Sequence, residues 1–560
     1  MLAQTQSALP PSGAAFYPLD QVHRGLRGVA YTVFEGVQPE AMDVEILGVL
    51  NGALGPHQDL ILARLKGTKP EYTGVVAGMS GSPVYADGKL LGAISYRIGE
   101  FSKEPICGIT PIAQMLEVRD ANQPAQQTAS ATVAASQGFL PIETPLVLSG
   151  FNADAVKLWQ DHFAGTSLMP LAGVGGGASN QPQPEPIVPG SAISAQLVRG
   201  DLQIAATCTV TYVDAKQLLA CGHPITQYGS VSMPMTKALV LATLPSPMNA
   251  FKIVNTTETV GSFTEDRHSA IRGAFGQSAR MVPVTVTLHG AVKPQVLHFE
   301  VIDQPQITPT AVLVCIYQAL QDSNSVGGDT SFHIRGNTDV EGFAPIPLDN
   351  WVAPAETQPA NLSAALMVGE RFSRIYSNST RLATIRSVNL DVEAVPERRT
   401  MQLEGARTSM TDVHAGETIT VEATVRPYHG PAKNLRIPVT LPASLPSGPV
   451  RLLVSDGAAL DRVTQPPRPG GKPLDLNATI AQMEGLRAND RVYVTLLAPS
   501  AQASIEGRTL PELPISMANV LEPLRNSQEM TLNGESAIPV TSIGVDAVLM
   551  GLQVISLRID

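Results

Sequence analysis

The stretch "GVVAGMSGSPVYADGKLLGAIS", residues 74–95, decides how the first part of the chain folds. It carries Gly78-Met79-Ser80-Gly81-Ser82-Pro83 between two strand-like runs, and the second run contains Asp87-Gly88. An Asp-Gly pair flanked by apolar residues is the strongest local signal for a tight β-hairpin. The stretch therefore predicts a glycine-flanked serine in a turn that leads directly into a hairpin.

Two kinds of catalytic motif place a serine between glycines. The nucleophile elbow is Gly-x-Ser-x-Gly and joins a strand to a helix. Here Ser82 stands where the last glycine would be, and a hairpin follows, which excludes the elbow. In the other motif, a loop of a β-barrel peptidase aims backbone amides at an oxyanion. This motif predicts Ser80 as nucleophile and the amides of Gly78 and Ser80 as the oxyanion hole.

A serine hydroxyl needs a base within hydrogen-bond reach, usually an imidazole. Of the ten histidines, His223 has the most distinctive context, because "LLACGHPITQYG" places it directly after a strand, between Gly222 and Pro224. A Gly-His-Pro sequence on its own is also typical of a rigid turn without chemistry. Beside the serine motif, we interpret His223 as the general base.

Composition limits the class of protein. A chain of 560 residues predicts three or four domains. With a net charge of -11 and no block of Lys or Arg, it lacks the footprint of a nucleic-acid binder. Short alternating apolar runs and the many glycines and prolines indicate a mainly β fold. No apolar run reaches the roughly 18 residues of a membrane helix, so no integral span is expected in this chain.

The first residues, "MLAQTQSALPPSGAAF", lack the basic and apolar regions of an intact signal peptide. They resemble the start of an exported protein after cleavage. We therefore expect a periplasmic or extracytoplasmic protein whose leader is missing or mis-started, and a cytoplasmic protein otherwise.

Composition shifts along the chain predict five regions, which are listed here in chain order. They are a serine-bearing β-barrel half (15–120), a linker with a short helical segment (121–189), a histidine-bearing β half (190–380), an immunoglobulin-like β-sandwich (385–457) and a mixed C-terminal domain (458–560). The sandwich is predicted from the period-2 alternation in "GETITVEATVRPYHG".

The four cysteines form no CxxC pair, which argues against a structural zinc site. In "CTVTYVDAKQLLAC", a two-residue turn at Asp214-Ala215 would place Cys208 opposite Cys221, close enough for a disulfide. The alternative is two reduced cysteines packed as small apolar residues. A metal site made of both cysteines and His223 is a third, weaker reading, because the spacing matches no standard ligand pattern.

These blocks resemble the SpoIVB-type serine peptidases, sporulation proteases of a chymotrypsin-like clan. The resemblance rests on "GMSGSP" with its hairpin and on "TCTVTYVDAKQLLACGHPI", and it covers roughly 200 residues. It implies two β-barrel halves, a protein or peptide substrate, Ser80 as nucleophile and His223 as base, with no cofactor. Here the serine block precedes the histidine block, which reverses the order in the sporulation protease, and neither its membrane anchor nor its PDZ domain is recognised.

The acid of a catalytic triad is not evident. The family has an aspartate shortly before the serine block, and this chain has none there. Asp59 is the predicted acid, Glu71 is the other nearby carboxylate, and Glu258 and Asp266 follow the histidine. The ordinary interpretation of each is a solvated surface charge.

A Ser-His dyad oriented by a backbone carbonyl is equally open. The alternative to an enzyme is an inactive peptidase fold that serves as an envelope binding or scaffold module. The oligomeric state is not predicted.

Overall fold

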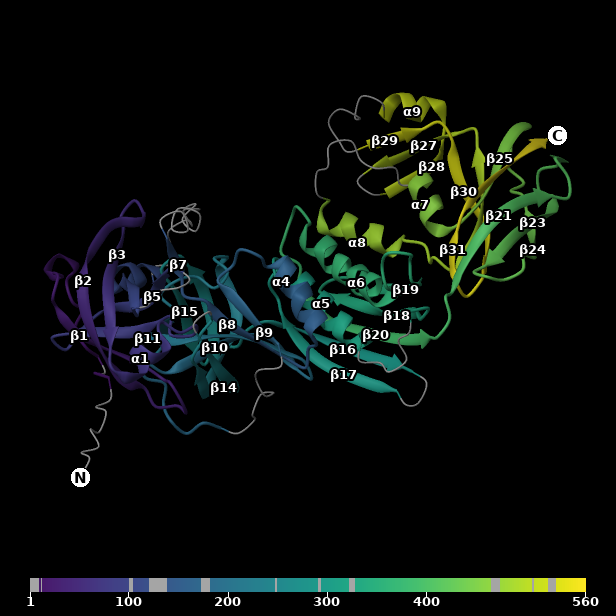
Figure 1. Cartoon of the computed structure of the whole chain (residues 1–560). Coiled ribbons are helices and arrows are strands. Elements are labelled where there is room, and N and C mark those ends of the chain that lie inside the picture. Colours follow the sequence, from purple (N-terminus) through teal and green to yellow (C-terminus); the bar gives the residue numbers. More distant parts are fainter. Residues whose placement is uncertain are drawn as a thin grey trace. The chain divides into compact units, whose positions relative to one another are not determined.

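The computed structural model describes residues 10–11, 13–99, 104–119, 138–172, 182–246, 249–290, 294–321, 328–464, 474–505, 508–521 and 530–560. Strands make up 52% of the structure and helices 17%, which confirms the prediction of a mainly β fold. The chain divides into two compact units, Met1–Val282 with His298–Cys315 and Pro283–Leu297 with Ile316–Asp560 (Figure 1). The three predicted catalytic residues, Ser80, His223 and Asp59, all lie in the first unit.

The first unit begins with a closed six-stranded barrel, which we call the serine barrel. In the order of pairing, its strands are β4 (Ser82–Ala86), β1 (Arg27–Thr32), β2 (Glu40–Gly55), β3 (Gln58–Lys66), β6 (Ile106–Pro111) and β5 (Lys89–Ile98). Strand β4 pairs back with β5, which closes the barrel. Alternate residues of these strands point inward, as in Met42, Val44 and Ile46 of β2, and build the apolar core.

The predicted hairpin between β4 and β5 is confirmed. Ala86 pairs with Lys89, and only Asp87 and Gly88 lie between them. Both have positive φ, 48° and 74°, as the two central residues of a type I′ turn require. The serine turn (residues 78–82) leads into this hairpin, because β4 begins at Ser82.

The second half of this unit is another ring of six strands, which we call the histidine barrel. Its pairing order is β10 (Ala192–Gly200), β13 (Gly229–Leu244), β14 (Phe251–Arg267), β15 (Ala270–Phe275), β12 (Gln217–Ala220) and β11 (Gln203–Val213). Strand β11 pairs back with β10. The prediction of two barrel-like halves is therefore confirmed. The division between the units falls near residues 283–316, well before the predicted boundary at 380.

The region predicted as a linker, 121–189, contains more structure than expected. Residues 121–137 and 173–181 of it lie outside the described residues. The expected helical segment forms α4 (Ala153–His162), whose first turn is capped by the Asn152 side chain. Three strands accompany it, namely β7 (Phe139–Pro141), β8 (Thr144–Ser149) and β9 (Leu168–Ala172). Strand β7 pairs with β5 of the serine barrel and β8 pairs with β11 of the histidine barrel, so this region joins the two.

The other helices that the structure describes wholly within this unit are short. They are α1 (Thr68–Thr73), α2 (Ile112–Leu116) and the 3-10 turns η1 (Leu19–Gln21) and η2 (Glu117–Arg119). Helix α5 (Thr308–Gln321) and strand β17 (Gln295–Ile302) contain points at which the chain passes from one unit to the other. Across the part of the chain that the structure describes, no helix has the length and apolarity needed to cross a membrane.

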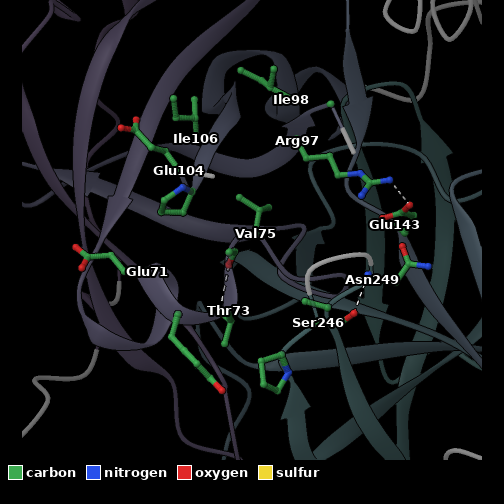
Figure 2. Close-up of a pocket in the computed structure, with 16 residues that line it drawn as sticks. Glu71, Thr73, Val75, Arg97, Ile98, Glu104, Ile106, Glu143, Ser246 and Asn249 are labelled. Carbon is green, nitrogen blue, oxygen red and sulfur yellow. Dashed lines mark hydrogen bonds and ion pairs between the residues drawn. The ribbon is translucent and has the colours of Figure 1, made fainter. Parts of the chain in front are cut away.

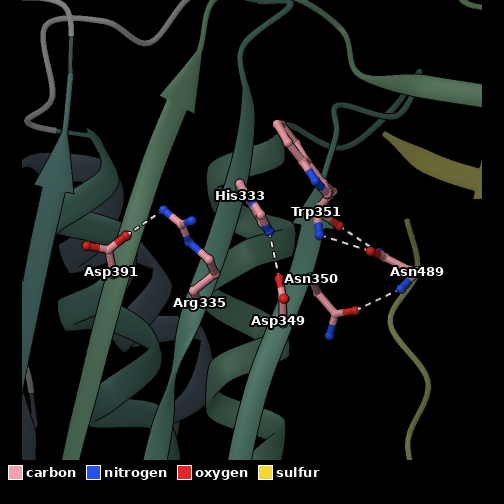
Figure 3. A network of polar contacts seen from close by, with 7 residues as sticks. All are labelled: His333, Arg335, Asp349, Asn350, Trp351, Asp391 and Asn489. Carbon is pink, nitrogen blue, oxygen red and sulfur yellow. Dashed lines mark hydrogen bonds and ion pairs between the residues drawn. The ribbon is translucent and has the colours of Figure 1, made fainter. Parts of the chain in front are cut away.

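The second unit starts with strands and helices between residues 281 and 395. These are β16 (Met281–His289), β18 (Ser331–Val340), β19 (Ile346–Val352), β20 (Ile385–Val395) and α6 (Ala360–Tyr376), with α8 (Leu476–Glu484) added from later in the chain. Figure 3 shows that the side chain of Asn489, which follows α8, is hydrogen-bonded to β19. Its side chain accepts a hydrogen bond from the Trp351 amide (2.9 Å) and donates one to the Trp351 carbonyl (2.7 Å), as a neighbouring strand would.

A β-sandwich completes the second unit. One sheet pairs β24 (Lys433–Thr440), β23 (Thr418–Pro427), β21 (Thr400–Thr408) and β31 (Val548–Met550), and the other pairs β22 (Asp412–Val413), β32 (Leu552–Ile559), β25 (Gly448–Ser455), β26 (Arg491–Ala498) and β30 (Ser536–Gly544). The two share one apolar core, which runs from Leu403 to Ile559. The predicted boundary at residue 457 therefore falls inside the sandwich, whose second sheet needs strands from the end of the chain.

Smaller elements decorate this sandwich. They are helices α7 (Gly457–Thr464) and α9 (Ile515–Leu521) and a sheet of β28 (Arg508–Leu513), β27 (Ala501–Ile505) and β29 (Met530–Asn533).

Candidate active site

Ser80 sits in a turn that hydrogen bonds fix on both sides. The Met79 amide donates to the Val76 carbonyl (3.0 Å), and the Ser82 amide donates to the Met79 carbonyl (3.0 Å). Gly78 and Gly81 have φ values of 92° and 95°, which L side chains rarely adopt. The motif needs glycine at both positions because a residue with a Cβ is strained at these φ values.

The serine turn docks onto strand β11 of the histidine barrel. Thr209 makes two of the docking bonds: its amide donates to the Ser80 carbonyl (2.8 Å) and its hydroxyl donates to the Gly78 carbonyl (2.9 Å). Thr211 adds a hydroxyl bond to the Gly81 carbonyl (2.7 Å). A Cβ on Gly81 would lie 1.9 Å from the Thr209 carbonyl oxygen and 2.5 Å from the Cys221 nitrogen. The two predicted motifs therefore meet, and only glycine fits between them.

The histidine turn (residues 221–227) is held from the serine barrel. The Thr110 hydroxyl donates to the Gly222 carbonyl (2.8 Å) and bonds the Ser95 hydroxyl (2.6 Å). A Cβ on Gly222 would come within 2.9 Å of Ser95 Cβ. His223, the residue after this close approach, is thus positioned by β5 and β6 as well as by its own strand.

The ring of His223 has a defined tautomer. Its Nδ1 lies 2.8 Å from the Pro224 carbonyl oxygen, and since a carbonyl can only accept, Nδ1 carries the proton and Nε2 the lone pair. Burial lowers the pKa of His223 to about 4, while the nearby backbone groups of Pro224 and Ile142 oppose this shift. At neutral pH the imidazole is therefore uncharged, so Nε2 carries no proton and can accept one, but a pKa this far below neutral makes it a weaker base than an ordinary histidine.

Ser80 and His223 are both fully buried, with no exposed surface. Among the residues that the structure describes, neither Ser80 Oγ nor His223 Nε2 has a hydrogen-bond partner. In this structure the two atoms do not bond each other, although the turns that carry them are in contact. Buried polar groups without partners are costly in proteins, so each calls for an explanation.

The predicted oxyanion donors differ from each other. Within the described residues, the Ser80 amide makes no hydrogen bond. The Gly78 amide donates to the Glu143 carbonyl (3.1 Å). An oxyanion would need that amide, so the Gly78 half of the predicted oxyanion hole is occupied by the chain itself.

The predicted acid, Asp59, lies in the β2–β3 hairpin. Its carboxylate accepts a hydrogen bond from the Gly52 amide (2.7 Å), and the hydrogen bond of His223 Nδ1 goes to Pro224 instead. Glu71 accepts from the Gly67 amide (3.2 Å) at the start of α1. The structure thus shows the contact that a Ser-His dyad oriented by a backbone carbonyl would use, namely the bond from His223 Nδ1 to Pro224. That Asp59 is the acid stays a prediction.

Glu258, the first carboxylate after the histidine, is bound elsewhere. It pairs with Lys237 (2.9 Å) and accepts from the Gln183 amide (3.0 Å).

Asp266 is a carboxylate whose structural role the sequence analysis did not predict. We interpreted it as a surface charge, and it is fully buried. It accepts hydrogen bonds from the amides of Ile225 (2.9 Å), Thr226 (2.7 Å) and Gln227 (3.0 Å) and from the Thr226 hydroxyl (2.6 Å). Burial raises the pKa of Asp266, while these bonds oppose that shift. Asp266 therefore fixes the chain immediately after His223 without touching the ring.

Lys252 is a second residue that no sequence pattern indicated. Its side chain is fully buried, passes within 3.4 Å of where a Gly78 Cβ would lie, and donates from Nζ to Thr32 Oγ1 (2.7 Å). Burial lowers the pKa of Lys252 to about 7. Its backbone amide also bonds the Ala77 carbonyl (3.2 Å) and so anchors the start of the serine turn to β14.

Cys208 and Cys221 form a disulfide with a Cα separation of 5.3 Å. The expected register is wrong: Val213 pairs with Leu218, and a bulge lies between Val210 and Tyr212. Because the two sulfurs bond each other, the metal site built from both cysteines and His223 is also wrong.

A cavity of about 340 Å³ lies between the serine barrel and residues that precede β14, among them Ser246 and Asn249, and no residue of the serine turn lines it (Figure 2). Val75, three residues before Gly78, lines it together with Ile98 and Ile106. Arg97 and Glu143 form an ion pair at its edge (2.5 Å), as the dashed line in Figure 2 shows. Glu143, whose carbonyl accepts the hydrogen bond from the Gly78 amide, thus also lines this cavity with its side chain.

Comparison with known proteins identifies no relative: no family model, no curated protein and no solved structure matches the chain. The resemblance to SpoIVB-type peptidases therefore stays a prediction.

Proposed function

We propose that this chain is a serine endopeptidase in which Ser80 is the nucleophile and His223 the general base. The observation that carries the proposal is the docking of the serine turn onto Thr209 and the histidine turn, at a spot where a Gly81 Cβ would overlap the Thr209 carbonyl. Two buried side-chain atoms without partners, the Ser80 Oγ and the His223 Nε2, lie on these two touching turns. A nucleophile and a base are the groups that such an arrangement suits.

The mechanism follows from the chemistry of these groups. His223 Nε2 takes the Ser80 hydroxyl proton while Oγ attacks the carbonyl carbon of a peptide bond. The resulting oxyanion is stabilised by the Ser80 amide and by the Gly78 amide once Glu143 releases it. The imidazolium then gives its proton to the leaving amine, and a water attacks the acyl-enzyme by the same route in reverse. The Pro224 carbonyl holds the tautomer, and Asp266 holds the turn.

We also propose an extracytoplasmic location, such as the bacterial periplasm, and a protein or peptide as substrate. The Cys208–Cys221 disulfide supports the location, because disulfides persist mainly in oxidising compartments.

Cleavage of an unfolded, fluorescein-labelled protein by the full chain tests the function. We expect release of labelled peptides by the wild type and none by Ser80→Ala. A Ser500→Ala variant is the matched control, since Ser500 lies in the second unit and should not alter the rate. If wild type and Ser80→Ala are equally inert toward a panel of such substrates, the non-catalytic binding module is the better description.

A further inference from the structure

Residues 142–145, which we call the covering segment, lie against the serine turn. The Glu143 carbonyl accepts the Gly78 amide (3.1 Å), and the Pro145 ring lies 3.3 Å from where a Gly78 Cβ would be. Ile142, a buried core residue, precedes them. A main-chain carbonyl on an oxyanion-hole amide occupies the position that the carbonyl of a substrate would take.

The covering segment is anchored at both ends. The Ile142 amide donates to the Ser95 carbonyl (2.9 Å), and the Thr144 amide donates to the Ser167 carbonyl (2.8 Å). Between these two anchors, Glu143 has one strong side-chain partner, Arg97, on strand β5. The ion pair is partly exposed, with 17% of the Arg97 side chain and 27% of the Glu143 side chain accessible, and it borders the cavity (Figure 2).

We propose that the covering segment is a built-in inhibitory segment, locked by the Arg97–Glu143 ion pair, and that the structure is the latent form of the protein. Three observations agree on this. The Gly78 amide is occupied by Glu143, the Ser80 side chain is fully buried, and Ser80 Oγ and His223 Nε2 are unpaired. Withdrawal of the Glu143 carbonyl frees the amide and lets solvent and substrate reach Ser80. That the lock inhibits catalysis rests on the proposed function, but the movement of the covering segment does not.

The test reads the movement without using catalysis. Ser80→Cys places a thiol in the turn, and its reaction with a small maleimide, located by peptide mass, reports access to position 80. In the Arg97→Leu background we expect the thiol to react roughly two to five times faster, since a partly exposed ion pair changes an equilibrium constant by about this factor. Raising the salt concentration should accelerate the reaction when Arg97 is present and not when it is leucine.

Arg199→Leu is the matched control, because Arg199 forms a comparable ion pair with Glu300 away from the serine turn. It should leave the rate unchanged. Equal maleimide rates with and without Arg97, or an equal rise in the Arg199→Leu background, would overturn the lock. A faster rate in Arg97→Leu, together with no proteolysis by the Ser80-containing Arg97→Leu protein, would keep the lock and refute the peptidase instead.

Discussion

The α-carbon of Gly81 faces the Thr209 carbonyl so closely that a Cβ would come within 1.9 Å of the oxygen. This approach joins two motifs that lie more than a hundred residues apart in the chain. Neither partner can yield, because Thr209 is a strand residue that also bonds Ser80 and Cys221 through its backbone.

Gly81→Ala should separate the serine turn from the histidine turn. The added methyl group overlaps backbone atoms and the φ of 95° disfavours alanine, so we expect a loss of about 3 kcal/mol or more in the free energy of unfolding, together with loss of proteolysis. Gly88→Ala is the control, since φ is also positive there but nothing lies within 4 Å. It should cost only about 1–2 kcal/mol. Equal effects of the two changes in urea unfolding would contradict the close approach.

Asp266→Asn should weaken the histidine turn. An amide group offers one acceptor oxygen where the carboxylate uses two, so at least one backbone N–H would face an NH₂ group. We expect a loss of about 2 kcal/mol in stability and a lower rate of proteolysis. Asp59→Asn provides the comparison, because its known bond is to the Gly52 amide at the barrel surface. A larger loss of activity in Asp59→Asn than in Asp266→Asn would favour Asp59 as the catalytic acid.

Lys252 should make the stability depend on pH in the alkaline range. Burial lowers its pKa from 10.5 to about 7 in the folded protein, so between these values the unfolded chain binds a proton that the folded chain does not. The free energy of unfolding therefore rises with pH through this window. Lys252→Met should lack this part of the rise. Urea unfolding of both proteins at several pH values between 7 and 10 measures the difference, and a constant difference would show that the buried amine does not titrate as we infer.

The Cys208–Cys221 disulfide should stabilise the histidine barrel and keep the histidine turn in place. Closing a loop with a sequence separation of 13 residues contributes about 3 kcal/mol by the loop-entropy model. We expect Cys208→Ser with Cys221→Ser to lower the midpoint of thermal unfolding. Cys107→Ser tests whether any lost thiol has this effect, since Cys107 is a buried free cysteine of the serine barrel. If a reducing agent leaves the wild-type midpoint unchanged, the bond contributes nothing.

Features encoded in short stretches were predictable from the sequence. The β4–β5 hairpin follows from Asp87-Gly88 alone, because few other residue pairs accept two positive φ angles. The alternation in β23 likewise marked a sandwich strand, although its sheet partners come from residues as late as 550. The turn between β11 and β12 has no such signature. Val213 pairs with Leu218, so four residues and not two separate the paired strands, and this longer turn, followed by the bulge near Tyr212, made the predicted register between the cysteines wrong.

The candidate site was predictable only in part. The Gly-x-Ser-Gly-Ser-Pro and Gly-His-Pro stretches identified two turns that the structure brings into contact. Burial has no local signal, so Asp266 read as a surface charge and Lys252 was not noticed at all. The role of Glu143 depends on its main-chain carbonyl, which every residue possesses. Such contacts follow from how two barrels pack and not from residue type.

Covalent labelling by a fluorophosphonate tests the central claim most directly. The probe is incubated for a day with the wild type, Ser80→Ala and His223→Gln, and the mass and position of any adduct are measured. The account predicts a single adduct on Ser80 in the wild type, none in Ser80→Ala, and a rate lowered by about 100-fold or more in His223→Gln. No adduct on the wild type, or an adduct on Ser80 that forms equally fast without His223, would contradict it.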